Sequence, residues 1–177
     1  PHGKLLGEKL MDADRVLYRR GNFNGTMDKL ICDALRQQLD TQIALSPGFR
    51  WGPTVLNGQS ITTENVLAQT AITYPEVYAQ SMTGEQIKGV MEDVCDNLFN
   101  LDPYYQQGGD MVRIGGMSYT CAPNESVGRR VSDLKLADGS NIDAGKSYRV
   151  AGWASLNEQK GAPIWEVVSS FLRDGKA

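Results

Sequence analysis

The stretch TMDKLICDALRQQLD, residues 26–40, has the pattern of an amphipathic helix. The turn-like GNFNG precedes it, and TQIALS, residues 41–46, follows as a short predicted strand. Apolar side chains recur in the helix at intervals of three and four residues, which is the period of a helix with one buried face. These residues are Met27, Leu30, Ile31, Ala34, Leu35 and Leu39.

Three further helices are predicted from the same periodicity and from residues that can cap a helix. In segment 83–100, Thr83 and Gln86 fit a capping box ahead of an apolar face. Residues 62–71 predict a short helix that Thr62 or Thr63 could cap, and residues 162–176 predict a closing helix. The apolar face of segment 83–100 consists of Ile87, Val90, Met91, Val94 and Leu98, and Cys95 lies on the same face.

Strands are predicted between these helices. Segment 74–82 is expected to be extended, residues 52–62 are turn-rich, and residues 111–122 read as one strand. Segment 131–153 alternates across an Asp138-Gly139 turn, which predicts a hairpin leading to a further strand. Helices and strands intermix without a βαβ repeat, so the predicted class is α+β, with layered mixed sheets and flanking helices in a single domain, residues 1–177.

Composition excludes several classes of function. With 177 residues, 41% of them hydrophobic, the chain can bury one core. A net charge of -3 provides no basic stripe, so we expect no nucleic-acid partner. No apolar run approaches the roughly 20 residues of a membrane-spanning helix, so no membrane contact is expected. No signal peptide precedes PHGKLLGEKL, and the abrupt start suits a fragment or processed product.

The numbers of histidine and cysteine residues exclude several kinds of catalytic and metal site. The sequence has one histidine, His2, so a Ser-His-Asp triad, a Cys-His dyad or a histidine-rich metal site cannot be assembled from it. The three cysteines lack the close pairs of a zinc site, and Cys95 is expected to be a small buried hydrophobic residue. One disulfide and a free thiol are compatible with export, but the pattern does not select a pairing.

Two loops have the composition expected where backbone approaches a ligand. SPGFRWG, residues 46–52, contains Arg50, whose planar guanidinium suits a carboxylate, phosphate or sulfate; the alternative is a solvated surface position. DPYYQQGGDMVR, residues 102–113, combines glycine with aromatic and charged residues. Ordinary turns are the competing interpretation of both loops.

Several motifs in order resemble the carboxy-terminal domain of the 5'-nucleotidase family. They are KLICDAL (29–35), IALSPGFRWG (43–52), NGQSITTENVLAQTAI (57–72), MTGEQIKGVMED (82–93), GGDMVRIGGMSYT (108–120) and SYRVAGW (147–153). Within that family, YRRGNFNGT, SPGFRWG and DPYYQQGGDMVRIGGMSYTCAP are most similar to the sulfate thiohydrolases of the SoxB type. The expected fold is therefore that of a 5'-nucleotidase C-terminal domain.

The resemblance implies that one domain carries out the reaction and a second domain binds the substrate. An amino-terminal metallophosphoesterase-like domain, outside this segment, would carry two manganese ions and the reaction chemistry. This segment would bind the substrate, a cysteine S-thiosulfonate on the flexible arm of a sulfur carrier protein, and would be inactive alone. The resemblance also implies a periplasmic location. The alternatives are a nucleotidase or phosphodiesterase domain, or a carrier-binding module without chemistry.

The resemblance also assigns residues to the site. Arg50 matches the arginine of the family's GGIR-type loop, which contacts the substrate anion or groups near it, while Leu45 replaces a usual asparagine. Gly108 and Gly109 match a GGF stretch whose phenylalanine stacks on a nucleotide base. Asp110 or Met111 occupies that position here, and the second stacking motif is replaced by NEQKGAPIW, which contains Trp165. Nucleotide hydrolysis is disfavoured because a base loses its stacking partners.

Further residues have two interpretations each. Tyr104 and Tyr105 either line a passage for the carrier arm or form a buried aromatic pair that holds the loop. Asp110 is expected to hold Arg50 or Arg113 by a salt bridge, to contact carrier backbone amides, or to be solvated. Arg113 is expected to point to water. The remaining assignments are Arg20 and Asn22 as substrate-facing residues, with Arg19 as the alternative, and Trp51 and Trp153 as core residues.

Overall fold

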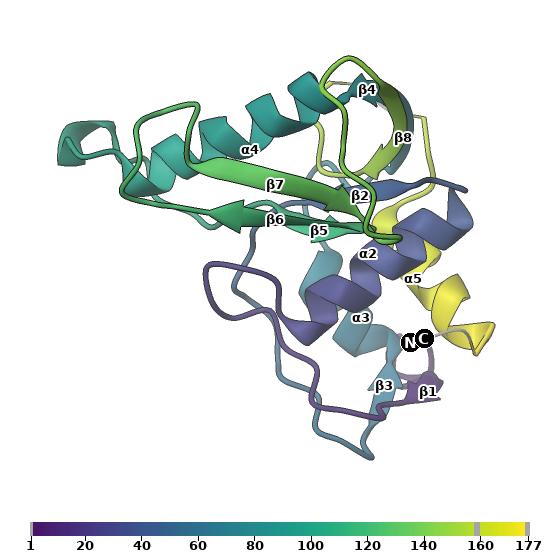
Figure 1. Ribbon diagram of the computed structural model, residues 1–177. Coiled ribbons are helices and arrows are strands. Elements are labelled where there is room, and N and C mark those ends of the chain that lie inside the picture. The colour runs from purple at the N-terminus through teal and green to yellow at the C-terminus, as the bar shows by residue number, and fades with distance from the viewer. Residues whose placement is uncertain (1, 158–159, 176–177) are drawn as a thin grey trace.

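The computed structural model describes residues 2–157 and 160–175 as an α+β fold in which helices and strands intermix along the chain (Figure 1). The helices are α1 (Gly3–Leu6), α2 (Thr26–Gln38), α3 (Thr63–Thr70), α4 (Gly84–Phe99) and α5 (Ile164–Arg173), with a 3-10 turn η1 (Pro103–Tyr105). The strands are β1 (Lys9–Asp12), β2 (Ile43–Ser46), β3 (Ser60–Thr62), β4 (Tyr78–Thr83), β5 (Arg113–Gly115), β6 (Met117–Cys121), β7 (Val131–Leu136) and β8 (Ser147–Gly152).

A four-stranded mixed sheet has the order β4-β8-β2-β5, so strands distant in sequence are neighbours in it. β8 and β2 are parallel, with Ile43 opposite Val150, and β4 and β5 are antiparallel to their neighbours. β6 and β7 form a two-stranded antiparallel ribbon, and β1 and β3 form another. Because β8 and β2 are neighbours, residues about a hundred positions apart in sequence share one sheet.

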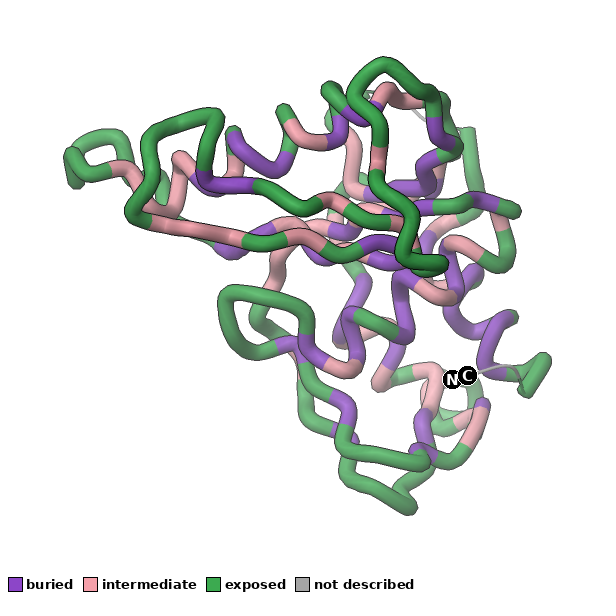
Figure 2. The backbone as a smooth tube through the Cα atoms, viewed as in Figure 1, coloured by how far each residue is buried: buried purple, intermediate pink, exposed green. Residues whose placement is uncertain are grey.

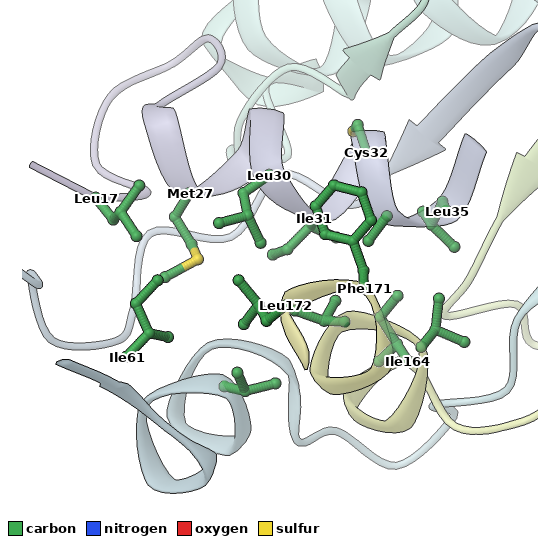
Figure 3. Packing of buried hydrophobic residues seen from close by; sticks show 14 of the residues in the cluster. Leu17, Met27, Leu30, Ile31, Cys32, Leu35, Ile61, Ile164, Phe171 and Leu172 are labelled. Carbon is green, nitrogen blue, oxygen red and sulfur yellow. The ribbon is translucent and has the colours of Figure 1, made fainter. Parts of the chain in front are cut away.

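The main core lies where α5 packs against α2 and α3, below the sheet in Figure 1. Ile31 and Leu35 of α2 lie toward Phe171 and Leu172 of α5, and Met27 of α2 points toward β3, as Figure 3 shows. All five are almost wholly buried (Figure 2). Burial of one such side chain stabilises the fold by about 1.5–3 kcal/mol, so this interface is a large part of the folding energy.

Helix α4 packs on the other side of the molecule, along the β6–β7 ribbon (Figure 1). Met91 and Cys95 of α4 are buried with Met111 and Val131 in a smaller core cluster. The burial of Cys95 confirms its prediction as a hydrophobic core residue. The ribbon therefore has its own small core beside α4.

All four predicted helices are present. Residues 26–38 form α2, and residues 164–173 form α5. The Thr62 hydroxyl accepts from the Asn65 amide at the start of α3, so Thr62 is its cap. At the start of α4, the Thr83 hydroxyl accepts from the Gln86 amide, and the Gln86 side chain accepts from the Thr83 amide, which confirms the capping box.

Three strand predictions need correction. The single strand expected over 111–122 is two strands, because Gly116 has a φ of 75° and redirects the chain from the four-stranded sheet to the ribbon. The Asp138-Gly139 turn is present, but its returning limb is a single bridge between Lys135 and Asn141, and residues 147–152 join a different sheet. The turn-rich segment 52–62 contains β3, which pairs with β1, and β1 was not predicted.

Candidate functional site

The two predicted ligand loops pack directly against each other. Residues 47–52 leave the end of β2, and the segment before β5 runs beside them. A Cβ atom at Gly48 would lie 2.6 Å from the Met111 carbonyl oxygen and 2.8 Å from the Asp110 Cβ. Only glycine allows this approach without a shift of the backbone. The glycine that precedes Arg50 by two positions therefore places the two loops in contact.

Arg50 is held at the surface by the second loop. Its Nε donates to Asp110 Oδ2 at 2.6 Å, and its Nη2 donates to the Gly109 carbonyl oxygen at 3.1 Å. The Arg50 side chain is 54% exposed, whereas Asp110 is 2% exposed. The buried carboxylate thus fixes one edge of the guanidinium while the group remains accessible. The predicted salt bridge between Arg50 and Asp110 is confirmed.

Asp110 is the outer carboxylate in a line of alternating charges that reaches the core. Arg113 Nη2 lies 3.4 Å from Asp110 Oδ2, and Arg113 Nε lies 3.5 Å from Asp28 Oδ2. Arg19 Nε donates to Asp28 Oδ1 at 2.7 Å. The side chains of Arg19, Asp28 and Arg113 have no exposed surface. The expectation that Arg113 points to water is wrong, because its charge has partners inside the molecule.

Burial dominates the electrostatics of this charge line. Desolvation raises the pKa of Asp28 above its usual range, although Arg19 and Arg113 oppose that shift. Desolvation likewise lowers the pKa of Arg113, and the charges of Asp28 and Asp110 oppose it. Three guanidinium groups and two carboxylates leave one excess positive charge. Since Arg50 is the exposed end, an anion that binds there meets a cation already oriented by buried groups.

Three polar atoms in the charge line lack hydrogen-bond partners in the described part of the chain. These are Asp110 Oδ1 and two nitrogens of Arg113, Nε and Nη1, all of which are buried. The Arg113 Nη2 atom, in contrast, donates to the Gly21 carbonyl oxygen at 2.7 Å. Ion pairs at 3.4 and 3.5 Å compensate the Arg113 charge without normal hydrogen-bond geometry.

Aromatic side chains support the loop that carries Arg50. Phe49 stacks on Trp51 with ring centroids 3.9 Å apart, and it meets the edge of Trp153 at 5.9 Å. The Arg19 guanidinium lies 5.5 Å from the centre of the Phe49 ring. Trp153 is buried and donates to Ser46 Oγ at 2.8 Å, as expected for a core residue. Trp51 is 44% exposed, so its prediction as core is wrong.

The loop before α2 lies against the same region. The Met111 amide donates to the Asn22 carbonyl oxygen at 3.0 Å. The side chains of Arg20 and Asn22 are exposed, whereas Arg19 is buried in the charge line. Arg20 and Asn22 therefore remain available to a ligand, and Arg19 acts within the fold.

The loop after α4 projects from the molecule (Figure 1) and is mostly exposed (Figure 2). Tyr104 is 87% exposed and Tyr105 is 60% exposed, and their rings meet edge to face at 5.4 Å. The buried-pair interpretation is therefore wrong. Gly108 and Gly109 have φ values of 78° and 93°, which L side chains rarely adopt. Met111 is fully buried beside Cys95, so its side chain does not reach the surface of this loop.

Sequence reasoning missed Asp28 and Phe49 as residues that shape the site. Asp28 precedes Ile31 by three residues and Leu35 by seven, so its helical spacing places a carboxylate on the buried face of α2. Because a buried carboxylate requires a charged partner, the position of Asp28 in the sequence could have predicted a buried ion pair. Phe49 gave no comparable signal, because its stacking partners are set by the loop conformation.

A separate open cleft of about 980 Å³ lies between α2 and the β6–β7 ribbon. Its lining includes Phe23, Arg36, Tyr119 and Lys135, and it does not include Arg50. Among residues 2–157 and 160–175, no three side chains of the His, Cys, Asp and Glu types gather to hold a metal ion. Within the same described residues, no helix has the length and apolar character to cross a bilayer.

Comparison with protein families gives one match across most of the chain. The model of the 5'-nucleotidase C-terminal domain matches residues 8–166. No curated protein sequence matches significantly.

Solved structures similar to the chain come from larger enzymes. The Thermus thermophilus sulfate thiohydrolase SoxB, in complex with glycerol, matches with a TM-score of 0.91 and 35% identity over 99% of this chain. The chain spans 34% of that protein. The Thermus thermophilus 5'-nucleotidase precursor matches with a TM-score of 0.73 and 18% identity, over 97% of this chain and 38% of that one. The Haemophilus influenzae NAD nucleotidase matches with a TM-score of 0.73 and 16% identity, over 97% and 36%.

Proposed function

Because this chain belongs to the family of 5'-nucleotidase C-terminal domains, we propose that it is the substrate-binding domain of a SoxB-like hydrolase. The substrate is a cysteine S-thiosulfonate on a sulfur carrier protein. In the net reaction, water supplies an oxygen to the sulfonate sulfur, and the bond between this sulfur and the neighbouring sulfane sulfur breaks. Sulfate and a proton are released, and the sulfane sulfur stays on the carrier cysteine as a persulfide. All three relatives described above support the assignment of this chain as a domain of a nucleotidase-family hydrolase.

The observation that carries this proposal is the exposed guanidinium of Arg50, held by the buried Asp110 carboxylate. A sulfonate is a tetrahedral oxyanion, and a charge-assisted hydrogen bond to arginine contributes about 1.5–3 kcal/mol. Asp110 and the Gly109 carbonyl occupy Nε and Nη2, so they fix the direction of the guanidinium. Arg50 therefore orients the sulfonate, and the buried charges behind it keep the cation in place before substrate arrives.

The carrier arm would approach along the loop after α4. Tyr104 and Tyr105 expose their rings there, and the 3-10 turn is fixed by Asp102, whose carboxylate accepts from the Tyr104 amide at 3.0 Å. Exposed tyrosines can contact a slim peptide with their rings and reach its backbone with their hydroxyls. Gly108 and Gly109 connect this loop to Asp110, so the segment that docks the carrier would continue into the residue that holds Arg50.

The metal centre belongs to a different part of the enzyme in this proposal. The described residues offer no cluster of metal ligands, so two manganese ions would be held by an amino-terminal metallophosphoesterase-like domain. When bound there, the metals would supply an activated water. This segment alone would then be inactive, and the periplasm, where sulfur carriers of this type work, is the proposed location.

Nucleotide hydrolysis is the second candidate, and one observation favours it. Trp51 lies next to Arg50 in the sequence and is 44% exposed, so a nucleotide base could stack on its ring. Such stacking contributes about 1–3 kcal/mol to binding. Against this candidate, Asp110 is engaged with Arg50, and Met111 is buried, so neither replaces the missing aromatic ring. The same complete enzyme should therefore turn over a nucleoside monophosphate far more slowly than a carrier-bound thiosulfonate.

Replacement of Arg50 in the complete enzyme tests the proposal. We expect Arg50→Ala to lower kcat/KM for sulfate release from the carrier by about 10- to 100-fold, the equivalent of one charge-assisted contact. Metal content should stay near the wild-type value, and thermal stability should fall only moderately, because the buried Asp110 carboxylate loses Arg50 but keeps Arg113 as an ion-pair partner. Sulfate is measured by ion chromatography, with Arg129→Ala, another exposed arginine, as the matched control.

An unchanged kcat/KM in Arg50→Ala would contradict the role of Arg50. Carrier binding without sulfate release by the metal-loaded enzyme would instead support a carrier-binding module. Faster hydrolysis of a nucleoside monophosphate than of the thiosulfonate would support the nucleotidase candidate.

A further inference from the structure

Two cysteines from distant parts of the chain meet beside α4. Cys95 lies four residues before the end of α4 and has no exposed surface, and Cys121 ends β6 and is partly exposed. Their Sγ atoms are 3.6 Å apart. The third cysteine, Cys32, is fully buried on α2 in a different core cluster. The structure thus selects one pairing among the three that the sequence left open.

We propose that Cys95 and Cys121 form an intrachain disulfide when the protein meets an oxidising environment. A disulfide has an S–S distance of about 2.05 Å, so the two sulfurs need to approach by about 1.5 Å. Rotation of the two side chains about their Cα–Cβ bonds can bring the sulfurs closer, because the Ala122 amide still donates to the Arg130 carbonyl and keeps the backbone of β6 paired beyond Cys121. Met111, Val131 and Tyr119 surround the pair, and the Cys95 Sγ lies 3.4 Å from the Met111 Sδ.

The more exposed sulfur should react first. Burial raises the pKa of the Cys95 thiol to about 12, so this group is a weak nucleophile near neutral pH. With a low-molecular-weight disulfide as oxidant, the Cys121 thiolate attacks one of its sulfurs and releases the first small thiol. The Cys95 thiol then loses its proton and attacks Cys121 Sγ in the mixed disulfide. The second small thiol leaves, so two protein thiols are oxidised and one small disulfide is reduced to two thiols.

The bond would constrain the segment that carries the candidate site. Cys95 and Cys121 are 26 positions apart, and the ring that they close contains the tyrosine loop, the glycine pair and Asp110. Cross-linking a loop of this size restricts the unfolded chain and should raise Tm by about 5–10 °C. The proposal concerns the oxidation state of the chain and does not depend on its substrate.

The test uses the full chain and oxidised glutathione as the probe. After exposure to an excess of oxidised glutathione, remaining thiols are blocked with a maleimide, and the protein is digested without reduction. The expected result is loss of two titratable thiols of the three, a linked peptide that contains Cys95 and Cys121, and free Cys32. Dithiothreitol should restore all three thiols and lower Tm to the value of the reduced protein.

Two variants keep the result unambiguous. Cys32→Ser should still form the linked peptide, because Cys32 takes no part in the bond. Cys121→Ser removes a partly exposed sulfur, so the chain should fold and lose the shift of Tm with dithiothreitol. Three free thiols in folded, oxidant-treated protein, or a linked peptide that contains Cys32, would overturn the proposal. Neither result would bear on Arg50, because turnover is not part of this measurement.

Discussion

Gly116 is the residue at which the chain leaves one sheet for another, and its backbone excludes other side chains. Its φ is 75°, and a Cβ atom there would lie 2.0 Å from the Gln42 carbonyl oxygen. Gly116→Ala should therefore lower the free energy of unfolding by about 2 kcal/mol or more, through strain and displaced backbone. Urea unfolding followed by circular dichroism measures this change.

Gly89 provides the matched control for that substitution. It lies exposed in α4, and a Cβ atom there would meet nothing within 4 Å. Gly89→Ala should stabilise the protein by about 0.5–1 kcal/mol, because alanine has the higher helix propensity. Equal effects of the two substitutions would contradict the constraint at Gly116.

At the scale of single residues, the sequence predicted contacts between the two ligand loops better than it predicted the interior. Among the alternatives that the sequence left open for Asp110, the structure selects the salt bridge, and it gives Asp110 both Arg50 and Arg113 as partners. Arg113 was placed in water because its strand alternates, but its partner Asp28 lies in a distant helix. Local periodicity contains no information on a partner 85 positions away, and only the position of Asp28 on an apolar face indicated a buried charge. Whether the site residues bind a sulfonate stays a prediction.

At the scale of elements, one ion pair fastens the end of α4 to the start of β7. Arg130 is buried, and its Nη1 donates to Asp96 Oδ1 at 2.6 Å. The hydrogen bond from Arg130 holds the pKa of Asp96 below its usual range, with a smaller contribution from Asn100. A carboxyl group with a lowered native pKa stabilises the fold above its unfolded pKa, and this stabilisation is lost as pH falls through the native pKa.

Asp96→Asn should therefore lower the urea midpoint at pH 7. The difference from the wild type should shrink from about pH 4 downward, because the wild-type carboxylate becomes protonated and loses its ion pair. Chemical unfolding from pH 7 to pH 2 measures this dependence. Asp93→Asn, an exposed carboxylate on the same helix, is the control and should show little change at any pH. A difference that grows as pH falls would contradict this assignment.

Helices were predicted more completely than strands for a physical reason. A helix satisfies its backbone hydrogen bonds within one segment, so periodicity and capping boxes at Thr62 and Thr83 identify it locally. Strands of three to six residues depend on partners elsewhere in the chain. β1 escaped prediction because its partner β3 is about fifty positions away, and β5 could be separated from β6 only through the conformation of Gly116.

At the scale of the whole molecule, the last helix closes the main core. The side chains that α5 buries include Ile164, Val167, Val168, Phe171 and Leu172. At about 1.5–3 kcal/mol each, their burial amounts to about 8–15 kcal/mol, which is comparable to the net stability of a domain. Removal of residues 162–177 should therefore abolish cooperative unfolding, as measured by calorimetry.

Removal of residues 1–6 is the control for that truncation. Helix α1 contains no buried residue, so its loss should leave the cooperative transition near its original temperature. A cooperative transition in the chain without residues 162–177 would show that α5 adds less than its buried area indicates.

The central position of β8 has a consequence for biosynthesis. β8 lies between β4 and β2, yet it is the final strand to be made, and its partner β2 emerges from the ribosome about a hundred codons earlier. At about 5–20 residues per second, β2 waits for five to twenty seconds with an unpaired edge. During that interval the unpaired edge of β2 is open to pairing with another chain, so the late synthesis of β8 exposes the nascent domain to aggregation.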